Sequence, residues 1–246
     1  MHCAAKKGHL EVCRLLLDSV VDKHPADVFG WTPLHAAAYQ GHLEVCRLIL
    51  DSVVEKSPTT DDGETPPHMA AIGGHLEVCR LLLETMEDKN PESEHYETPL
   101  DRAAEYKHLE VCRLILDRME DANPNGETHR LQNLLKRIPG RIPGYLDPQE
   151  GYLEFCCLIL DRMEDKHPET DWTASLQDAL IVAAEYGELE VCCLILDRVE
   201  DKKQAAENAL QSGRSLSHFR SWMRKYPDIV DLLQSYLARS EYSSSA

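Results

Sequence analysis

The stretch that decides the fold is Gly41–Leu50, which reads Gly-His-Leu-Glu-Val-Cys-Arg-Leu-Ile-Leu. It recurs with small changes along the chain, beginning at Gly8, Gly41, Gly74, Lys107, Gly151 and Gly187. The first three intervals are 33 residues each, and intervals of 44 and 36 residues follow. A fixed period of this length indicates a stacked array of repeats.

Each copy of this stretch predicts a helix that is apolar around most of its circumference. In Leu43–Asp51 only Glu44, Arg47 and Asp51 are polar, and they form one narrow stripe. Such a helix is buried between neighbours. Ahead of it, Thr32 and Pro33 predict the start of a shorter helix, with His35 completing a hydrogen-bonded cap. Each unit is therefore a helix pair that is stable only when stacked.

These residues resemble the ankyrin repeat. The likeness is close at Gly30–Leu50 and good at Gly63–Leu83, where Pro67 replaces a leucine. Thr98–Leu116 keeps Thr-Pro-Leu but has Asp101 in place of the histidine. The resemblance implies an all-α solenoid of stacked helix-turn-helix units with short hairpin-like turns between repeats. It also implies a non-enzymatic scaffold or adaptor without a cofactor.

The units divide the chain at regular places. We expect an array over residues 1–200, with units near 1–26, 27–59, 60–92, 93–125, 126–169 and 170–200. The fifth unit carries extra residues, which predict a short helix at 129–136 and an inserted loop at 137–149. Residues 201–239 are expected to form a degenerate capping repeat, with His218–Lys225 as its first helix, and 240–246 a disordered tail.

The family usually ends its second helix with a left-handed glycine, and here that glycine is missing. Its place is taken by Val20, Val53, Met86, Met119, Met163 and Val199. We therefore expect the second helices to continue for about another turn, until a proline stops them.

The cysteines follow the repeat. Six of the nine stand at one position of the recurring stretch, which favours a buried core slot over disulfides: Cys13, Cys46, Cys79, Cys112, Cys156 and Cys192. Free thiols imply a reducing compartment, and no apolar run is long enough for a secretory signal or a membrane span. We expect a cytoplasmic protein. Cys157 and Cys193 replace the arginine of the polar stripe and are expected to be exposed.

The chain offers little for catalysis. His42 and Cys46 are four residues apart and recur as a pair, which raises zinc binding or a Cys–His pair as an alternative. The histidine begins the helix and the cysteine fills a core slot, so we favour a structural role. The net charge of −17 argues against nucleic acid and anionic lipid, and favours a partner that carries positive charge.

Surface recognition remains. Ankyrin arrays bind partners through the turn tips and the outer side of the first helices. The resemblance therefore implies that a protein partner, which we expect to be basic and partly apolar, binds on this face. The residues at these positions are Val28, Phe29, Trp31, Tyr39, Gln40, Asp61, Asp62, Glu64, Ile72, Glu94, His95, Glu97, Glu105 and Tyr106. Alternatively, Phe29 and Trp31 only cover neighbouring tips. Two other hypotheses stay open, namely a truncated piece of a larger ankyrin-bearing protein such as an ion channel, and self-association through the uncapped N-terminal face.

Overall fold

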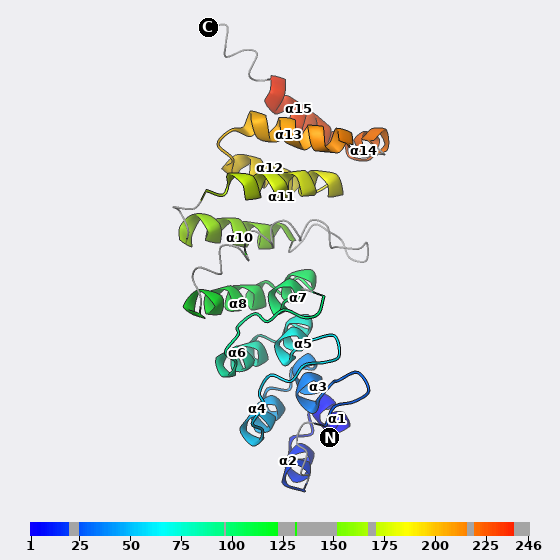
Figure 1. Ribbon diagram of the computed structural model, residues 1–246, viewed down its shortest axis with the longest axis vertical. Helices are drawn as coiled ribbons and strands as arrows, with labels where there is room; N and C mark the ends of the chain where they lie inside the picture. Colours follow the sequence, from blue (N-terminus) through cyan, green and yellow to red (C-terminus); the bar gives the residue numbers. More distant parts are fainter. Residues whose placement is uncertain are drawn as a thin grey trace. The chain divides into compact units, whose positions relative to one another are not determined.

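The computed structural model describes residues 1–19, 25–95, 97–122, 131, 152–166, 171–215 and 219–238. Throughout this part of the chain the regular secondary structure is helical (Figure 1). The chain divides into two compact units, residues 1–127 and 128–246. None of the described helices combines the length and the apolar character that a membrane span requires.

The first unit consists of four helix pairs. Their members are α1 (His2–Lys6), α2 (Leu10–Ser19), α3 (Pro33–Tyr39), α4 (Leu43–Ser52), α5 (Pro66–Gly73), α6 (Leu76–Thr85), α7 (Pro99–Glu105) and α8 (Leu109–Ala122). The shorter helices α1, α3, α5 and α7 stack on one another, and so do α2, α4, α6 and α8 (Figure 1). This arrangement confirms the stacked all-α architecture.

The core lies between these two layers. Ala37 and Ala38 are fully buried, which lets the short helices approach closely, and Cys46 and Ile49 are fully buried on the longer helix. The other five cysteines of the same slot are buried too, as expected. Glu44, Arg47 and Asp51 are exposed. The recurring stretch is thus the buried support of each repeat.

The glycine between the two helices of a pair is required for two reasons. Gly41 has a φ of +76°, in the left-handed region that favours glycine. A Cβ at Gly41 would also overlap the ring of His75, which lies against it. Lys107 stands at the same place in the fourth pair and takes a φ of +61° at some cost in backbone energy.

The second unit contains α10 (Tyr152–Lys166), α11 (Thr173–Tyr186), α12 (Leu189–Arg198), α13 (Lys202–Ser215), α14 (Phe219–Lys225) and α15 (Pro227–Ala238). α11 packs on α12 and α13, and α15 packs on α13 and α12. Helix α15 buries Ile229, Val230 and Leu233.

Helix α13 was not predicted. It packs on α11, and its Ala205, Ala206 and Ala209 are buried. The helix expected at His218–Lys225 is present as α14 (Phe219–Lys225). α14 lies beside α13, where Trp222 Nε1–H donates to the carbonyl of Ala184 at 3.0 Å.

The prediction of longer second helices is only partly right. α8 and α10 do run on, to Ala122 and Lys166. However, α4, α6 and α12 end at Ser52, Thr85 and Arg198, and the next residue is extended in each case.

Lysine side chains account for two of these early ends. Lys56 Nζ donates to the carbonyl of Leu50 at 2.8 Å, and Lys89 Nζ donates to that of Leu83 at 2.6 Å. A cation at a helix C-terminus satisfies orphan carbonyls and interacts favourably with the helix dipole. Lysine thus replaces the missing glycine.

Several expectations fall on residues that lie outside the described part. The helix expected at 129–136 is described only at Leu131, which is helical and fully buried. The loop at 137–149, the tail at 240–246 and the junction at 20–24 are not among the described residues.

Candidate functional site

Three turn tips stand side by side ahead of α3, α5 and α7. Each is closed by a backbone hydrogen bond, from Asp27 to Trp31 (2.8 Å), from Thr60 to Glu64 (2.9 Å) and from Ser93 to Glu97 (2.8 Å). The tips are also joined to one another, because Asp61 N–H donates to Phe29 O at 3.1 Å and Glu94 N–H donates to Asp62 O at 2.9 Å. The expected hairpin-like turns are therefore present, and they form one continuous surface.

The histidines of the first helices fix these tips. His68 Nδ1 accepts a hydrogen bond from Thr65 N–H at 3.0 Å, which completes the cap of α5 as predicted for its counterpart His35. The ring is therefore neutral, and its Nε2–H donates to the carbonyl of Glu97 in the next tip at 3.0 Å. His35 donates in the same way to Glu64, at 3.1 Å. Burial lowers the pKa of His68, against the opposing effect of the Glu97 carbonyl.

The first tip supplies the apolar part of the predicted surface. Val28 is 85% exposed and Phe29 is 68% exposed. Trp31 is half-buried, and its ring meets that of Tyr39 edge to face, with centroids 6.0 Å apart. Gln40 is exposed beside Tyr39. Trp31 and Tyr39 are thus in contact, while Phe29 is exposed on the same tip.

The next two tips supply the acidic part. Asp61, Asp62 and Glu94 are exposed, and His95 Nε2 lies 3.8 Å from Asp62 Oδ1. In the part of the chain that the structure describes, no lysine or arginine side chain lies within ion-pair distance of these three carboxylates. These carboxylates form the exposed acidic part of the two tips.

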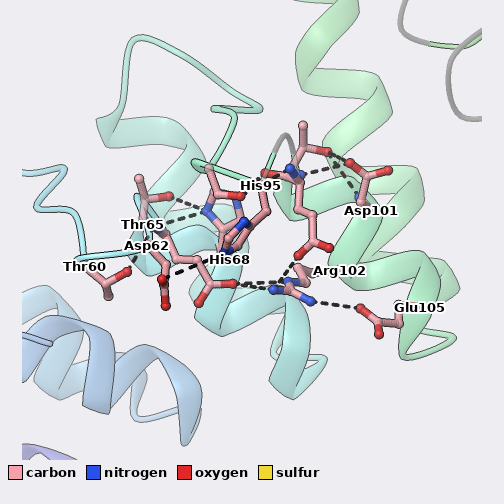
Figure 2. Close-up of polar contacts among 12 residues, drawn as sticks. Thr60, Asp62, Thr65, His68, His95, Asp101, Arg102 and Glu105 are labelled. Atoms are coloured by element: carbon pink, nitrogen blue, oxygen red, sulfur yellow. Dashed lines mark hydrogen bonds and ion pairs between the residues drawn. The ribbon is translucent and has the colours of Figure 1, made fainter. Parts of the chain in front are cut away.

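Glu64 and Glu97 are placed differently. Both turn toward Arg102 on α7, with Nη2 2.7 Å from Glu64 and 2.5 Å from Glu97, while Nη1 lies 3.1 Å from Glu105 (Figure 2). Burial alone would lower the pKa of Arg102, but the hydrogen bonds and charges of these glutamates outweigh it and raise that pKa. Three of the predicted acidic residues thus meet one guanidinium.

Sequence reasoning missed Arg102. It stands at the position of Ala36 and Met69 in the preceding units, on the side of the first helix that faces the tips. Glu64 and Glu97 are 33 residues apart and so adjacent in space. This 33-residue spacing was the feature of the sequence from which the cluster could have been predicted.

At the far end of this surface Tyr106 is exposed, and its ring stacks on His108 with centroids 6.5 Å apart. Ile72 is half-buried on α5. Its carbonyl accepts a hydrogen bond from His108 Nε2–H at 3.1 Å. Both residues lie where the repeat register placed them.

The repeated histidine and cysteine do not converge. His42 Nε2–H donates to the carbonyl of Lys6 at 3.0 Å, and His75 donates likewise to Tyr39. Burial raises the pKa of Cys46 to about 12, which leaves the thiol protonated. Among the described residues no group of three metal-ligating side chains is gathered. The contacts of the repeated histidine and cysteine therefore support a structural role for the pair.

The two cysteines of the polar stripe are less open than expected. Cys157 and Cys193 are half-buried, and burial raises the pKa of both thiols. Cys3 on α1, in contrast, is exposed.

The comparisons agree with this fold. A family model described as ankyrin repeats, in three copies, matches residues 1–60 and 53–127. These matches together cover residues 1–127, which is more than half of the 246-residue chain. No curated protein matches the chain. The stacked helix pairs, the histidine caps and the family match lead to one conclusion, that the chain belongs to the ankyrin-repeat family.

Proposed function

We propose that this protein is a non-enzymatic adaptor that binds a basic, partly apolar protein partner on the turn tips and first helices of residues 27–106. Ankyrin repeats are generally protein–protein interaction modules, and the family is typically non-enzymatic. The observation that carries the proposal is the adjoining pair of tips, one exposing Phe29 and the next exposing Asp61 and Asp62.

The aromatic and the acidic parts of this surface contribute to binding in different ways. Exposed aromatic side chains provide binding energy when a partner covers them. Exposed carboxylates contribute mainly to association rate and specificity for a cationic partner. Glu64, Glu97 and Glu105 already contact Arg102 and serve to hold the tips in place. We therefore assign the acidic contacts to Asp61, Asp62 and Glu94.

A defined probe tests this proposal. The peptide acetyl-Gly-Arg-Arg-Phe-Arg-Arg-Gly-amide, labelled with fluorescein, is titrated with the full chain while its anisotropy is followed. The double variant Asp61→Lys/Asp62→Lys should bind it about 10-fold more weakly, which corresponds to about 1.4 kcal/mol. The matched control is Glu44→Lys/Glu77→Lys, which changes the net charge equally on exposed residues of α4 and α6. Equal losses in both variants would mean that only net charge matters.

A second candidate is self-association through the N-terminal face. Val12 on α2 is 47% exposed, whereas Val45 and Val78 at the same repeat position are 2% exposed. Leu15 beside it is 69% exposed. Leu48 and Leu81, at the position of Leu15, are half-buried, so both side chains occupy positions that are less exposed in the next two repeats. Light scattering should show a mass that rises with concentration and that Leu15→Glu abolishes; a constant mass in the unmodified protein would exclude this candidate.

We further place the protein in the cytoplasm. All nine cysteines lie in the described part of the chain and all nine are free. Free thiols persist in a reducing compartment. Localisation of a tagged full chain by microscopy tests this placement, and secretion of the tagged chain would contradict it.

A further inference from the structure

A cavity of about 210 Å³ lies beside the first turn tip, where α1 faces α3. Cys3 and Lys6 of α1 line one side of it, and Trp31, Ala36 and Tyr39 line the other. The lining is mainly carbon, with two aromatic rings and an alanine methyl group. None of these residues takes part in the Arg102 cluster.

The backbone that carries Trp31 is held in place by hydrogen bonds on both sides. The backbone N–H of Trp31 donates to Asp27 Oδ1 at 2.9 Å, and the backbone carbonyl of Trp31 accepts from His2 Nε2–H at 2.8 Å. The ring of Trp31 also meets Tyr39 at an interplanar angle of 68°. Two walls at a steep angle form a corner, and a preformed corner lowers the entropy cost of binding.

The size and chemistry of the cavity select its occupant. A dry apolar cavity of roughly 150 Å³ is enough to hold benzene. About 210 Å³ therefore has room for one phenylalanine ring or leucine side chain. Asp27 Oδ1 at the margin is already engaged, since it accepts from both Phe29 N–H and Trp31 N–H, and Lys6 lines the opposite side. The apolar remainder of the lining favours an apolar side chain.

We propose that this cavity receives one bulky apolar side chain of the partner, flanked in the partner's sequence by lysine or arginine. The inference rests on the proposed function and specifies the partner's recognition element. The flanking charge follows from the tips, because Phe29 O is bonded to Asp61 N–H at 3.1 Å. A side chain in the cavity therefore brings its basic neighbours beside Asp61 and Asp62.

Cys3 gives a direct readout of occupancy, because it lines the cavity and is exposed. The arginine–phenylalanine peptide is compared with a twin that has alanine in place of phenylalanine. At four times its Kd the phenylalanine peptide should slow alkylation of Cys3 by iodoacetamide about fivefold, since protection follows 1 + [L]/Kd. The alanine peptide should leave the rate nearly unchanged. Cys157 and Cys193, in the second unit, are internal controls whose rates should not change in either case.

Filling the cavity provides the mutational test. Cys3→Trp places an indole in the space, and Cys3→Ser, which keeps the volume, is the matched control. In anisotropy titrations Cys3→Trp should lose the advantage of the phenylalanine peptide over the alanine peptide, while Cys3→Ser keeps it.

The outcomes separate this inference from the proposed function. If both peptides bind equally well, and binding depends on Asp61 and Asp62, the cavity assignment is overturned while the proposed function stands. Equal binding by Cys3→Trp and Cys3→Ser overturns the assignment as well. If neither peptide binds the unmodified protein, both proposals fall.

Discussion

Replacing Arg102 with methionine should destabilise the first unit by about 2 kcal/mol, because three carboxylates would lose their common partner. The side chain of Arg102 is 21% exposed, and those of Glu64 and Glu97 are 15% and 12% exposed. Removing one partner of a fully buried pair costs about 3–5 kcal/mol, whereas exposed pairs contribute about 0–1 kcal/mol. A cluster that is mostly but not fully buried falls between these limits.

The same substitution at Arg80 is the control. Arg80 pairs with Glu77 at 3.6 Å, and the two side chains are 42% and 64% exposed. Arg80→Met should therefore cost less than about 0.5 kcal/mol. Adding Glu97→Gln to Arg102→Met should restore about 1 kcal/mol, since the most buried of the carboxylates would no longer be charged.

Urea unfolding of the full chain, followed by circular dichroism, measures these differences. Hydrogen exchange resolved by mass spectrometry then shows whether the amides of α5 and α7 lose protection. If Arg102→Met and Arg80→Met lie within about 0.5 kcal/mol of each other, the cluster does not hold the tips and the reasoning fails.

Three further predictions concern the scaffold. Gly41→Ala should lower the free energy of unfolding by about 2 kcal/mol or more, because the backbone at Gly41 is left-handed and a Cβ there would overlap the ring of His75. Lys107→Ala should change that free energy little, and thermal melting of the two variants compares them. Burial lowers the pKa of His68, so its contribution to stability is complete above the unfolded pKa of about 6.5 and is lost as the pH falls below it. Urea unfolding at several pH values should therefore show a smaller acid loss in His68→Gln than in the unmodified protein, and identical losses would refute the assignment. Lys89→Met removes the cation from the carbonyl of Leu83 and should cost about 1 kcal/mol, with faster amide exchange confined to the end of α6.

The repeated parts of the molecule could be predicted because each is determined by local chemistry. The helix start at Thr32 and Pro33, the cap by His35 and the buried slot of Cys46 need only the residues within one unit. Their recurrence then indicates stacking, since a helix that is apolar around most of its circumference needs neighbours.

The parts that could not be predicted depend on side chains that reach outside their own motif. Lys56 and Lys89 cap helices from six residues downstream, and no motif marks that distance. Arg102 gathers carboxylates from two tips and from α7. α13 lacks the Thr-Pro-Leu-His start of the repeat motif, and it packs on α11 with Ala205, Ala206 and Ala209 buried.

The histidine hydrogen bonds between repeats predict the order in which the helix pairs of the first unit open. His35 and His68 each donate to a carbonyl 29 residues ahead, and His42, His75 and His108 each donate to one 36 residues behind. An inner helix pair is therefore tied in both directions, and releasing it breaks bonds with two neighbours at once. Asp101 caps α7 in place of a histidine, and its carboxylate has no ring N–H to donate forward. Opening should accordingly begin at the outer pairs, and the amides of α3 to α6 should be the last to exchange with solvent.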